Sequence, residues 1–440
     1  MILKQRSEKI SYTKDQKEAL LEVEKFLKKP KTYDQNLNTF KLAGYAGTGK
    51  TTIIENIFSY ARDILHYDVY VSAPTNAAVK VLRHKSADWL AGLIDYKEKF
   101  RTLHSLLYGE PDDDGNWNAK CSFTQGQLVI IDESSMIDTF VNNDINKHIA
   151  KHGAKVIKIG DGFQLEPVGD DPKVLRNPHY ELKNVQRHDG VILDYVTKLR
   201  EIKKSCVPTK SKDEVDVLDI EEVGKKWLDG LKNYDDSVFI VAKNKTRVLL
   251  NKLARTHKFG EEPSALRKTD QIIVIANSPT YKNSETFRVN KVIDIRPLEI
   301  YSKDGDSFGD CYYCKVEIMG RDGEYDMFLF PNTVRPSIYH PEIDITTLPF
   351  DLEHLIDRKF YKKPILSRSV LITTYGYAIT AHKSQGSQWD NVYIHNDYWG
   401  DNPRWLYTAA SRAIEFLTMS NNSSGKKITW EEIIEGNGHV

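Results

Sequence analysis

The sequence predicts an α/β fold built on doubly wound parallel sheets. Short apolar runs of strand type alternate with segments of helical periodicity, the arrangement that gives parallel strands joined by helices. The polar motifs at 44–51, 132–133 and 164 each come at or soon after the end of such a run. Ligands of doubly wound sheets bind at the carboxyl ends of the strands. The alternation and the motif positions therefore indicate the same architecture.

Length and composition narrow the class of protein. A chain of 440 residues has room for two or more domains. Its formal net charge is zero, so a nucleic-acid partner needs a local basic groove. No apolar run approaches the ~18 residues of a membrane span, and the N-terminus has no signal-peptide core. Four cysteines are too few for a disulfide scaffold. We therefore expect a cytoplasmic protein without a membrane partner, and we expect Cys311 and Cys314 to be strand residues.

A helix is expected over residues 11–28, ahead of the first strand. Ala19, Leu20 and Val23 share one face at helical spacing, and Thr13 is a plausible N-cap. Gln16 lies in the first turn, shortly before a phosphate-binding motif. An amide at this place can read an adenine edge, because it offers both a donor and an acceptor. The alternative is an ordinary solvent-facing glutamine.

The stretch Gly44–Thr51 fits G-x-x-x-x-G-K-[ST] at every fixed position. An apolar run precedes it and a helical run follows, which is the context of a phosphate-binding loop. The glycines permit left-handed turns that aim backbone N–H groups at phosphate oxygens. Lys50 adds a positive charge, the Thr51 hydroxyl is placed to bind Mg²⁺, and the helix start favours an anion. A nucleoside triphosphate is the best-supported ligand.

Two further strands end in residues that complete a nucleotide site. The run 128–132 ends in Asp132, followed by Glu133. Asp132 suits Mg²⁺, which prefers few carboxylates and several waters, and Glu133 suits polarising the attacking water. The run 156–161 is followed by Gln164, whose amide can sense the γ-phosphate.

The remaining chain predicts a second α/β unit with two insertions. Residues 108–127 are rich in turn formers and indicate a protruding hairpin or loop. Residues 201–226 are charged and poorly periodic, so we expect a surface excursion. A strand at 238–242 and a helix at 245–254 begin the second unit. From 270 to 366, short alternating runs separated by turns predict an antiparallel β barrel or sheet, and the α/β pattern resumes at 370–374.

With these stretches assembled, the chain resembles superfamily 1B helicases of the RecD/Dda type. The resemblance covers nearly the whole chain, through motifs in the family's order. Thr13–Gln16 resembles the family's Q motif, 44–52 its motif I, 73–78 its motif Ia and 102–107 its motif Ib. Further along the chain, 130–136 resembles motif II, 160–169 motif III and Gln186-Arg187 motif IV. Near the end, 379–390 resembles motif V and 406–413 motif VI.

The resemblance implies two RecA-like domains with ATP and Mg²⁺ between them. The first would span 1–185, with 108–127 as a pin-like insertion; the second would combine 186–269 and 367–440. Residues 270–366 would form an inserted SH3-like domain. By similarity, Arg187 and Arg412 reach the γ-phosphate and Gly386 approaches the nucleotide, while Lys50 with Asp132, Glu133 and Gln164 completes catalysis. The implied nucleotide contacts are Gln16, Gly44, Ala46, Gly47, Thr48, Gly49, Lys50, Thr51 and Thr52.

The same resemblance implies a DNA track across both domains. Small polar groups at the matched positions suit phosphate contacts, which position a strand without reading its sequence. In the insertion, Trp117 and Phe123 are the candidates for base stacking. The implied DNA contacts are Thr75, Asn76, His104, Trp117, Phe123, Thr380, His382 and Ser384.

The sequence therefore predicts an ATP-driven DNA helicase, most similar to phage Dda-type enzymes. The family implies a monomer that moves 5′→3′ on single-stranded DNA, acts at single-strand/duplex junctions and has a single-stranded-DNA-binding protein as a candidate partner. One alternative is a DNA-dependent ATPase that remodels protein–DNA complexes without productive unwinding, which the acidic 108–127 stretch keeps open. Another is a P-loop kinase or small-molecule ATPase, which leaves motifs Ia, III, V and VI unexplained.

Overall fold

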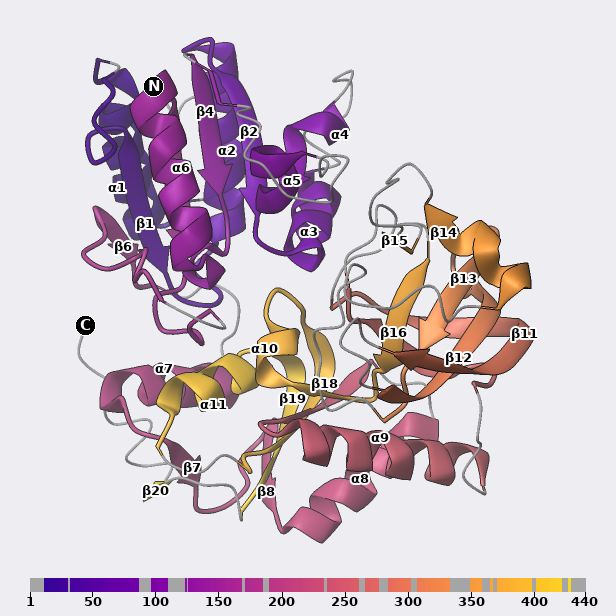
Figure 1. Cartoon of the computed structure of the whole chain (residues 1–440). Coiled ribbons are helices and arrows are strands. Elements are labelled where there is room, and N and C mark those ends of the chain that lie inside the picture. The colour runs from indigo at the N-terminus through magenta and orange to yellow at the C-terminus, as the bar shows by residue number, and fades with distance from the viewer. Residues whose placement is uncertain are drawn as a thin grey trace. The chain divides into compact units, whose positions relative to one another are not determined.

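The computed structural model describes most of the chain. The described ranges are 12–30, 32–86, 96–109, 123–124, 126–167, 171–184, 190–232, 236–260, 266–276, 284–301, 307–332, 349–357, 365–366, 370–397, 401–421 and 426–428. Within them, residues 12–184 and residues 190–428 belong to two compact units, each considered by itself (Figure 1). None of the helices in these ranges combines the length and apolar character that a membrane span requires.

The first unit is a six-stranded, all-parallel sheet in the order β3-β2-β4-β5-β1-β6. Its strands are β1 (Thr39–Gly44), β2 (Asp68–Ala73), β3 (Phe100–Thr102), β4 (Gln127–Ile131), β5 (Lys155–Gly160) and β6 (Tyr180–Leu182). Its helices are α1 (Lys14–Lys28), α2 (Lys50–Asp63), α3 (Asn76–Ser86), α4 (Tyr96–Lys99), α5 (Leu103–Tyr108), the 3-10 turn η2 (Ser134–Met136) and α6 (Thr139–His152).

Helices cover both faces of this sheet, because its strands are apolar on both sides. Along β4, Leu128 and Ile130 pack into a core cluster with residues of α1, α2 and α3. The alternate residues Val129 and Ile131 join α5 and α6 in a second cluster. Strands buried on both faces read as continuous apolar runs, which explains why the sequence signal was clear here. The predicted doubly wound sheet is confirmed for this unit.

The second unit contains a five-stranded parallel sheet in the order β17-β9-β18-β19-β8. Its strands are β8 (Val215–Leu218), β9 (Ser237–Val241), β17 (Ala378–Thr380), β18 (Trp389–His395) and β19 (Ala413–Ser420). Its helices are α7 (Val191–Ile202), α8 (Ile220–Lys232), α9 (Asn244–Phe259), α10 (Ala381–Ser384) and α11 (Pro403–Ala410). The short strands β7 (Cys206–Pro208) and β20 (Lys426–Ile428) form a separate parallel pair.

A closed barrel of five strands is inserted in this unit, in the order β10-β11-β12-β13-β16 (Figure 1). Its strands are β10 (Gln271–Val274), β11 (Thr286–Tyr301), β12 (Ser307–Ile318), β13 (Glu324–Leu329) and β16 (Leu371–Tyr375). The 3-10 turn η5 (Phe350–Leu355) and the pair β14 (Ile356–Asp357) and β15 (Ile365–Leu366) lie between β13 and β16 in the chain. Cys311 and Cys314 lie in β12 and are buried, as expected for strand residues.

Two expectations about this unit need correction. The run at 370–374 was expected to resume the parallel sheet, but β16 pairs with β10 and β13 and closes the barrel. The barrel therefore extends to Tyr375. The stretch 201–226 was expected to be an irregular excursion, yet it contains β7, β8 and the first turns of α8. Both errors have one cause: an apolar run or a short half-buried strand does not by itself reveal which sheet will accept it.

A buried ion pair joins the barrel to the parallel sheet. Arg255 on α9 and Asp270, just before β10, are 4% and 0% exposed, and their side chains form two bonds of 3.0 and 3.1 Å. Asp270 also accepts from the Arg267 N–H and the Tyr377 hydroxyl. The Arg255 guanidinium lies over the Tyr375 ring at 4.0 Å. One carboxylate therefore holds α9, the entry to the barrel and the exit from it.

We predict that Asp270→Asn destabilises the chain by about 3–5 kcal/mol, because it leaves a buried guanidinium without its counter-charge. The measurement is the free energy of unfolding in denaturant, read on the transition of the second unit. Lys232→Ala is the control, since the Lys232–Asp229 pair is 57% exposed on both sides and should change stability by no more than about 0.5 kcal/mol. Equal midpoints for both variants would contradict the prediction.

Candidate active site

The phosphate-binding loop links β1 to α2. Gly47 and Gly49 have φ values of 83° and 79°, in the left-handed region that favours glycine. The Thr48 side chain folds back and donates to the Tyr45 carbonyl at 2.9 Å. A Cβ on Gly49 would lie 2.3 Å from Gln16 Nε2, so a side chain at that position would displace the Gln16 amide from the loop. The predicted loop is thus present as a strand–loop–helix connection with its tight turns at the glycines.

Lys50 opens α2 and folds over the loop. Its Nζ atom donates to the carbonyls of Gly44 and Tyr45, both at 2.8 Å. Carbonyl contacts of this kind are readily exchanged for phosphate oxygens, which carry more charge. Thr51 and Thr52 follow in the first turn and are half-buried. The ammonium and the helix start therefore belong to one small surface at the end of β1.

The acidic pair follows β4, two strands from β1. Asp132 is 7% exposed; its backbone N–H donates to the Ser72 carbonyl at 2.8 Å and its Oδ1 accepts from the Glu133 N–H at 2.9 Å. Glu133 has a φ of 50°, a left-handed conformation that is uncommon outside glycine. Such strain is retained where surrounding structure fixes it, often at functional sites. Gln164 follows β5, the strand between β4 and β1, and is 3% exposed.

The residues present fit a polar ligand such as a nucleoside triphosphate with Mg²⁺. Four buried side-chain oxygens at these strand ends have no hydrogen-bond partner among the described residues: Glu133 Oε2, Gln164 Oε1 and the hydroxyls of Ser134 and Ser135. A buried polar group left unpaired costs about 1–3 kcal/mol, so native structures rarely keep several together without a ligand or water. The carboxylates and Thr51 also supply the oxygen ligands that Mg²⁺ prefers.

Asp161 was not selected from the sequence, yet it joins two parts of this site. It directly follows β5 and is fully buried, and its Oδ2 accepts from the Ala46 N–H of the phosphate loop at 3.0 Å. Its Oδ1 accepts from the Phe163 N–H at 2.9 Å, next to Gln164. The only sequence signal was an aspartate directly after a buried strand, the same signal that selected Asp132.

Gln16 contacts the phosphate loop. Its side chain is 5% exposed; the amide nitrogen donates to the Thr48 carbonyl at 3.0 Å, and the amide oxygen accepts from the Thr13 N–H at 3.1 Å. The Gln16 N–H in turn donates to the Thr13 hydroxyl oxygen at 3.2 Å, which completes a capping box at the start of α1. The amide is therefore engaged in bracing the loop and capping a helix, and the solvent-facing alternative is wrong.

The predicted residues of the second unit are described around α10 and α11. Arg412 is 4% exposed, and its guanidinium donates to the carbonyls of Thr408 and Ser387 at 3.0 and 3.3 Å and to the Ser411 hydroxyl at 2.8 Å. Gly386, beside Ser387, has a φ of 80°. The arginine thus lies on the turn that carries Gly386. Arg187, its expected partner, lies outside the described residues.

A lysine in the same segment has a perturbed pKa. Burial lowers the pKa of Lys383 to about 8, and the positive charge of Arg247 on α9 acts in the same direction. The positive charge of this segment therefore falls as the pH rises through 8. Its neighbours differ in exposure: His382 is exposed, whereas Thr380 and Ser384 are 8% and 0% exposed. The Ser384 hydroxyl donates to the Ala381 carbonyl at 2.8 Å, so it serves α10 and is poorly placed for DNA.

The candidate DNA contacts of the first unit differ in their exposure and in the contacts that their side chains already make. The Thr75 hydroxyl accepts from the Ala78 N–H at the start of α3, where Asn76 begins the helix. His104 is exposed on α5, and its ring centroid lies 4.5 Å from that of Tyr108. Trp117 lies outside the described residues, as do 110–122 and 125 of the expected pin.

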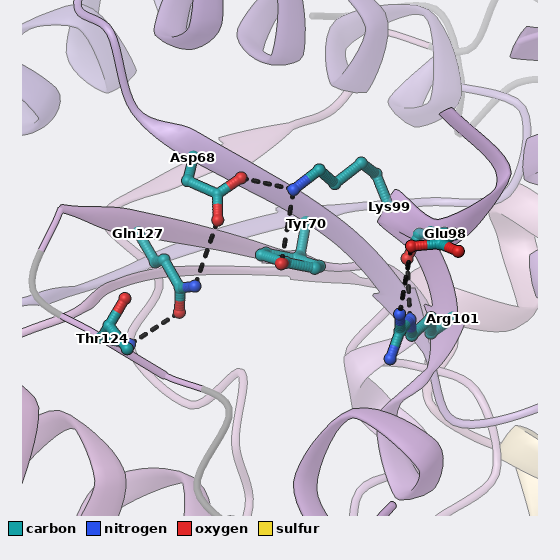
Figure 2. Close-up of polar contacts among 7 residues, drawn as sticks. All are labelled: Asp68, Tyr70, Glu98, Lys99, Arg101, Thr124 and Gln127. Atoms are coloured by element: carbon teal, nitrogen blue, oxygen red, sulfur yellow. Dashed lines mark hydrogen bonds and ion pairs between the residues drawn. The ribbon is translucent and has the colours of Figure 1, made fainter. Parts of the chain in front are cut away.

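Phe123 requires a correction, because it is fully buried and cannot present its ring to a base. It packs in the core cluster of α5 and α6, with its ring 5.3 Å from that of His148. The residue after it, Thr124, is bonded to the sheet: the Gln127 amide accepts from the Thr124 N–H at 2.6 Å and donates to Asp68 at 3.1 Å (Figure 2). Lys99 completes the network with Asp68 and Tyr70.

Comparisons with known proteins were consistent with this site. Residues 13–215 match a model of the AAA domain, and residues 375–419 match a model of the UvrD-like helicase C-terminal domain. An uncharacterized protein of Acanthamoeba polyphaga mimivirus is 25% identical and aligns over 87% of this chain and 96% of its own length. The RecBCD enzyme subunit RecD of Buchnera aphidicola is 25% identical over 81% of this chain and 65% of that protein.

Solved structures share the fold. Pif1 helicase from Bacteroides, in complex with ADP-AlF3 and single-stranded DNA, has a TM-score of 0.51 at 18% identity and covers 97% of this chain and 95% of its own. A second structure, from work on DNA unwinding at forked duplex DNA by two coordinating Pif1 helicases, has a TM-score of 0.53 at 18% identity. The alignment covers 98% of this chain and 98% of that chain. The structural likeness shows a shared fold, and the family models and relatives together support an ATP-dependent DNA helicase as the enzyme class.

We predict that Asp161→Asn weakens ATP binding by about tenfold, because an amide cannot accept from both the Ala46 and Phe163 N–H groups at charge-assisted strength. Titration with a fluorescent ATP analogue measures the change. Asp63→Asn is the control, since Asp63 lies at the far end of α2 in an exposed pair with Arg62. An unchanged affinity in a folded Asp161→Asn variant would remove Asp161 from the site.

Proposed function

We propose that the chain is an ATP- and Mg²⁺-dependent helicase that translocates on single-stranded DNA and unwinds duplex DNA. The observation that carries this proposal is that Lys50, Glu133 and Gln164 lie at the carboxyl ends of three adjacent strands. The buried oxygens Glu133 Oε2 and Gln164 Oε1 have no hydrogen-bond partner among the described residues. These strand ends supply what phosphoryl transfer requires, which is positioning and charge stabilisation. The residue order along the chain and the matches to helicase models and relatives support the motor assignment.

Each residue has a proposed role. The loop from Gly44 to Thr52 holds the phosphates through its N–H groups, and Lys50 neutralises the β- and γ-oxygens. Thr51 and Asp132 hold Mg²⁺, which neutralises charge on the phosphates when bound. Glu133 takes the proton of the attacking water, and its buried, unpaired Oε2 suits that task. The Gln164 amide contacts the γ-phosphate. Asp161, three residues earlier, fixes the position of this segment against the phosphate loop through its bond to the Ala46 N–H.

The second half of the site is proposed to come from the second unit. Arg187 and Arg412 stabilise charge on the γ-phosphate when two RecA-like domains close, and Gly386 approaches the nucleotide. We propose 1–185 as the first domain, with the pin confined to the part of 108–127 between the core residues Tyr108 and Phe123. The second domain comprises 186–269 and the chain after the barrel, and the barrel itself is the SH3-like insertion. For Arg412 to act, its guanidinium must exchange the Ser387 carbonyl for phosphate.

We propose that the strand runs over Thr75, Asn76 and His104 in the first unit and Thr380 and His382 in the second. Phosphate contacts at such groups bind without sequence preference. The Bacteroides Pif1 structure is bound to single-stranded DNA, which supports the choice of partner. We further propose a monomeric cytoplasmic enzyme of the phage Dda type that moves 5′→3′, acts at single-strand/duplex junctions and works beside a single-stranded-DNA-binding protein.

A second candidate is a translocase that strips proteins from DNA without unwinding it. The observation that favours it is the run of acidic residues at 112–114 in the proposed pin, since a negative tip repels the phosphates of a fork. Both candidates hydrolyse ATP in response to single-stranded DNA. They differ in strand separation, so one set of substrates distinguishes them.

We predict that single-stranded DNA stimulates ATP hydrolysis and that a duplex with a 5′ tail is unwound, whereas one with a 3′ tail is not. ATPase rates with and without DNA and a fluorescent strand-separation assay measure the two activities. Lys50→Ala serves as the inactive control, because the phosphates lose the loop's cation. Unwinding from the 3′ tail alone would overturn the direction. Stimulated hydrolysis without unwinding of either duplex would favour the translocase, and hydrolysis insensitive to DNA would overturn both.

We predict that Arg412→Ala retains nucleotide binding but lowers turnover by about 10³-fold, the scale of arginine-finger losses. ATPase turnover and analogue affinity are measured on the same preparation. Because Arg412 also bonds to Ser387 and Thr408, the thermal midpoint is recorded, and Arg412→Lys tests whether charge alone suffices. A folded Arg412→Ala variant with wild-type turnover would exclude the residue from catalysis.

A further inference from the structure

Phe140 is the most exposed large apolar side chain that the structure describes, at 65%. It lies in the first turn of α6, and α6 follows Glu133 and the 3-10 turn after the carboxyl end of β4. Its ring is therefore on the side of the sheet where ligands bind. A lone exposed aromatic is unremarkable on its own, so what surrounds this ring decides its meaning.

A buried ring fixes the position of Phe140. The ring of Tyr108 lies beside it, with centroids 6.4 Å apart and planes 21° apart. Tyr108 is 1% exposed, and its hydroxyl donates to Asp144 on α6 at 2.8 Å. The same Tyr108 ring contacts His104, which is one of the proposed DNA contacts. Phe140 and His104 thus share one rigid support, and both are exposed.

A groove along α6 begins at Phe140. It has a volume of about 420 Å³ and is lined by Gln35, Phe140, Asn143, Asn146, Lys147 and Ala150. The lining provides an aromatic face, three amides and one ammonium group, and no carboxylate. Asp144, which pairs with the lining residue Lys147 at 2.9 Å, is 8% exposed and also accepts from the Tyr108 hydroxyl. These are the groups that a nucleotide requires: a ring for the base, amides for polar edges and a cation for the phosphate.

We propose that Phe140 and this groove hold one nucleotide of the single-stranded DNA, with its base stacked on the Phe140 ring and its phosphate near Lys147. Phe140 thereby takes the stacking role that Phe123 cannot fill. The inference rests on the proposed function, since it adds a contact to the same DNA track. Stacking on an aromatic ring is tolerant of sequence, as a motor that moves along any strand requires.

The test compares Phe140→Ala with wild type on two oligonucleotides of equal length, one of thymidines and one in which every nucleotide is abasic. Fluorescence anisotropy gives both dissociation constants at one salt concentration. We expect Phe140→Ala to bind the thymidine strand about tenfold more weakly, within the range for loss of a base–aromatic stack, and to match wild type on the abasic strand. Phe140→Trp should restore thymidine binding. Ile64→Ala, which removes another exposed apolar side chain at the far end of α2, is the control.

The outcomes separate this inference from the proposed function. Wild-type protein that binds neither oligonucleotide overturns both. Wild-type binding together with an unchanged Phe140→Ala variant overturns the stacking site alone. An equal loss on both oligonucleotides also overturns it, because the ring would then act on the fold instead of on a base. Thermal midpoints of all variants accompany the titrations.

The phosphate contact is tested by the salt dependence of binding. Lys147→Gln should lower the slope of log K against log salt by about 0.7, the value for one phosphate of a single strand. Lys232→Gln is the matched control, because both lysines pair with an aspartate three residues earlier in a helix. An unchanged slope for Lys147→Gln would exclude Lys147 from the contact.

Discussion

The bond between the Asp161 carboxylate and the Ala46 N–H is the interaction on which the nucleotide site depends. A loop whose backbone must face phosphates cannot satisfy its N–H groups by ordinary secondary structure, so something else must hold its shape. Asp161 holds it from β5, the Gln16 amide holds the Thr48 carbonyl from α1, and Lys50 closes over the carbonyls at its start. Three different elements therefore keep the loop ready before any ligand binds.

The second unit has a comparable fixed point in Asp270, with a different consequence. The Arg255–Asp270 pair is buried, and such a pair is weak evidence for stability but costs much when broken. Its position is more informative than its energy. Asp270 precedes the first barrel strand, and Tyr375 and Tyr377 flank the return to the parallel sheet. Arg255 contacts Asp270 and the Tyr375 ring, and the Tyr377 hydroxyl donates to Asp270. The barrel is thus held at both of its connections to the sheet by a single cluster.

The sequence predicted where the candidate site residues lie wherever a local pattern determines their position. The loop at 44–51, the acids at 132–133 and Gln164 were predicted because each follows directly from a strand end, and a strand buried on both faces gives an unmistakable apolar run. The sequence did not predict the burial or strand pairing of residues whose contacts lie far away in the chain. Nothing near Phe123 reveals that α6 will cover it, and nothing near Phe140 reveals that its side chain will be 65% exposed. Likewise, the run 371–375 suits a barrel and a parallel sheet equally, and pairing with β10 and β13 decided the matter.

The segment 133–140 connects the two proposed roles of the first unit. Glu133 adopts a left-handed conformation, a 3-10 turn follows, and Asp138 caps α6 by accepting from the Val141 N–H at 2.8 Å. The Met136 N–H donates to the Glu133 carbonyl at 3.1 Å within this turn, so hydrogen bonds connect the backbone at Glu133 to the start of α6. If a base stacks on Phe140 as proposed above, it would restrain the start of α6 and, through it, the Glu133 carboxylate that we propose activates water. DNA binding would then influence hydrolysis by a route inside the first unit.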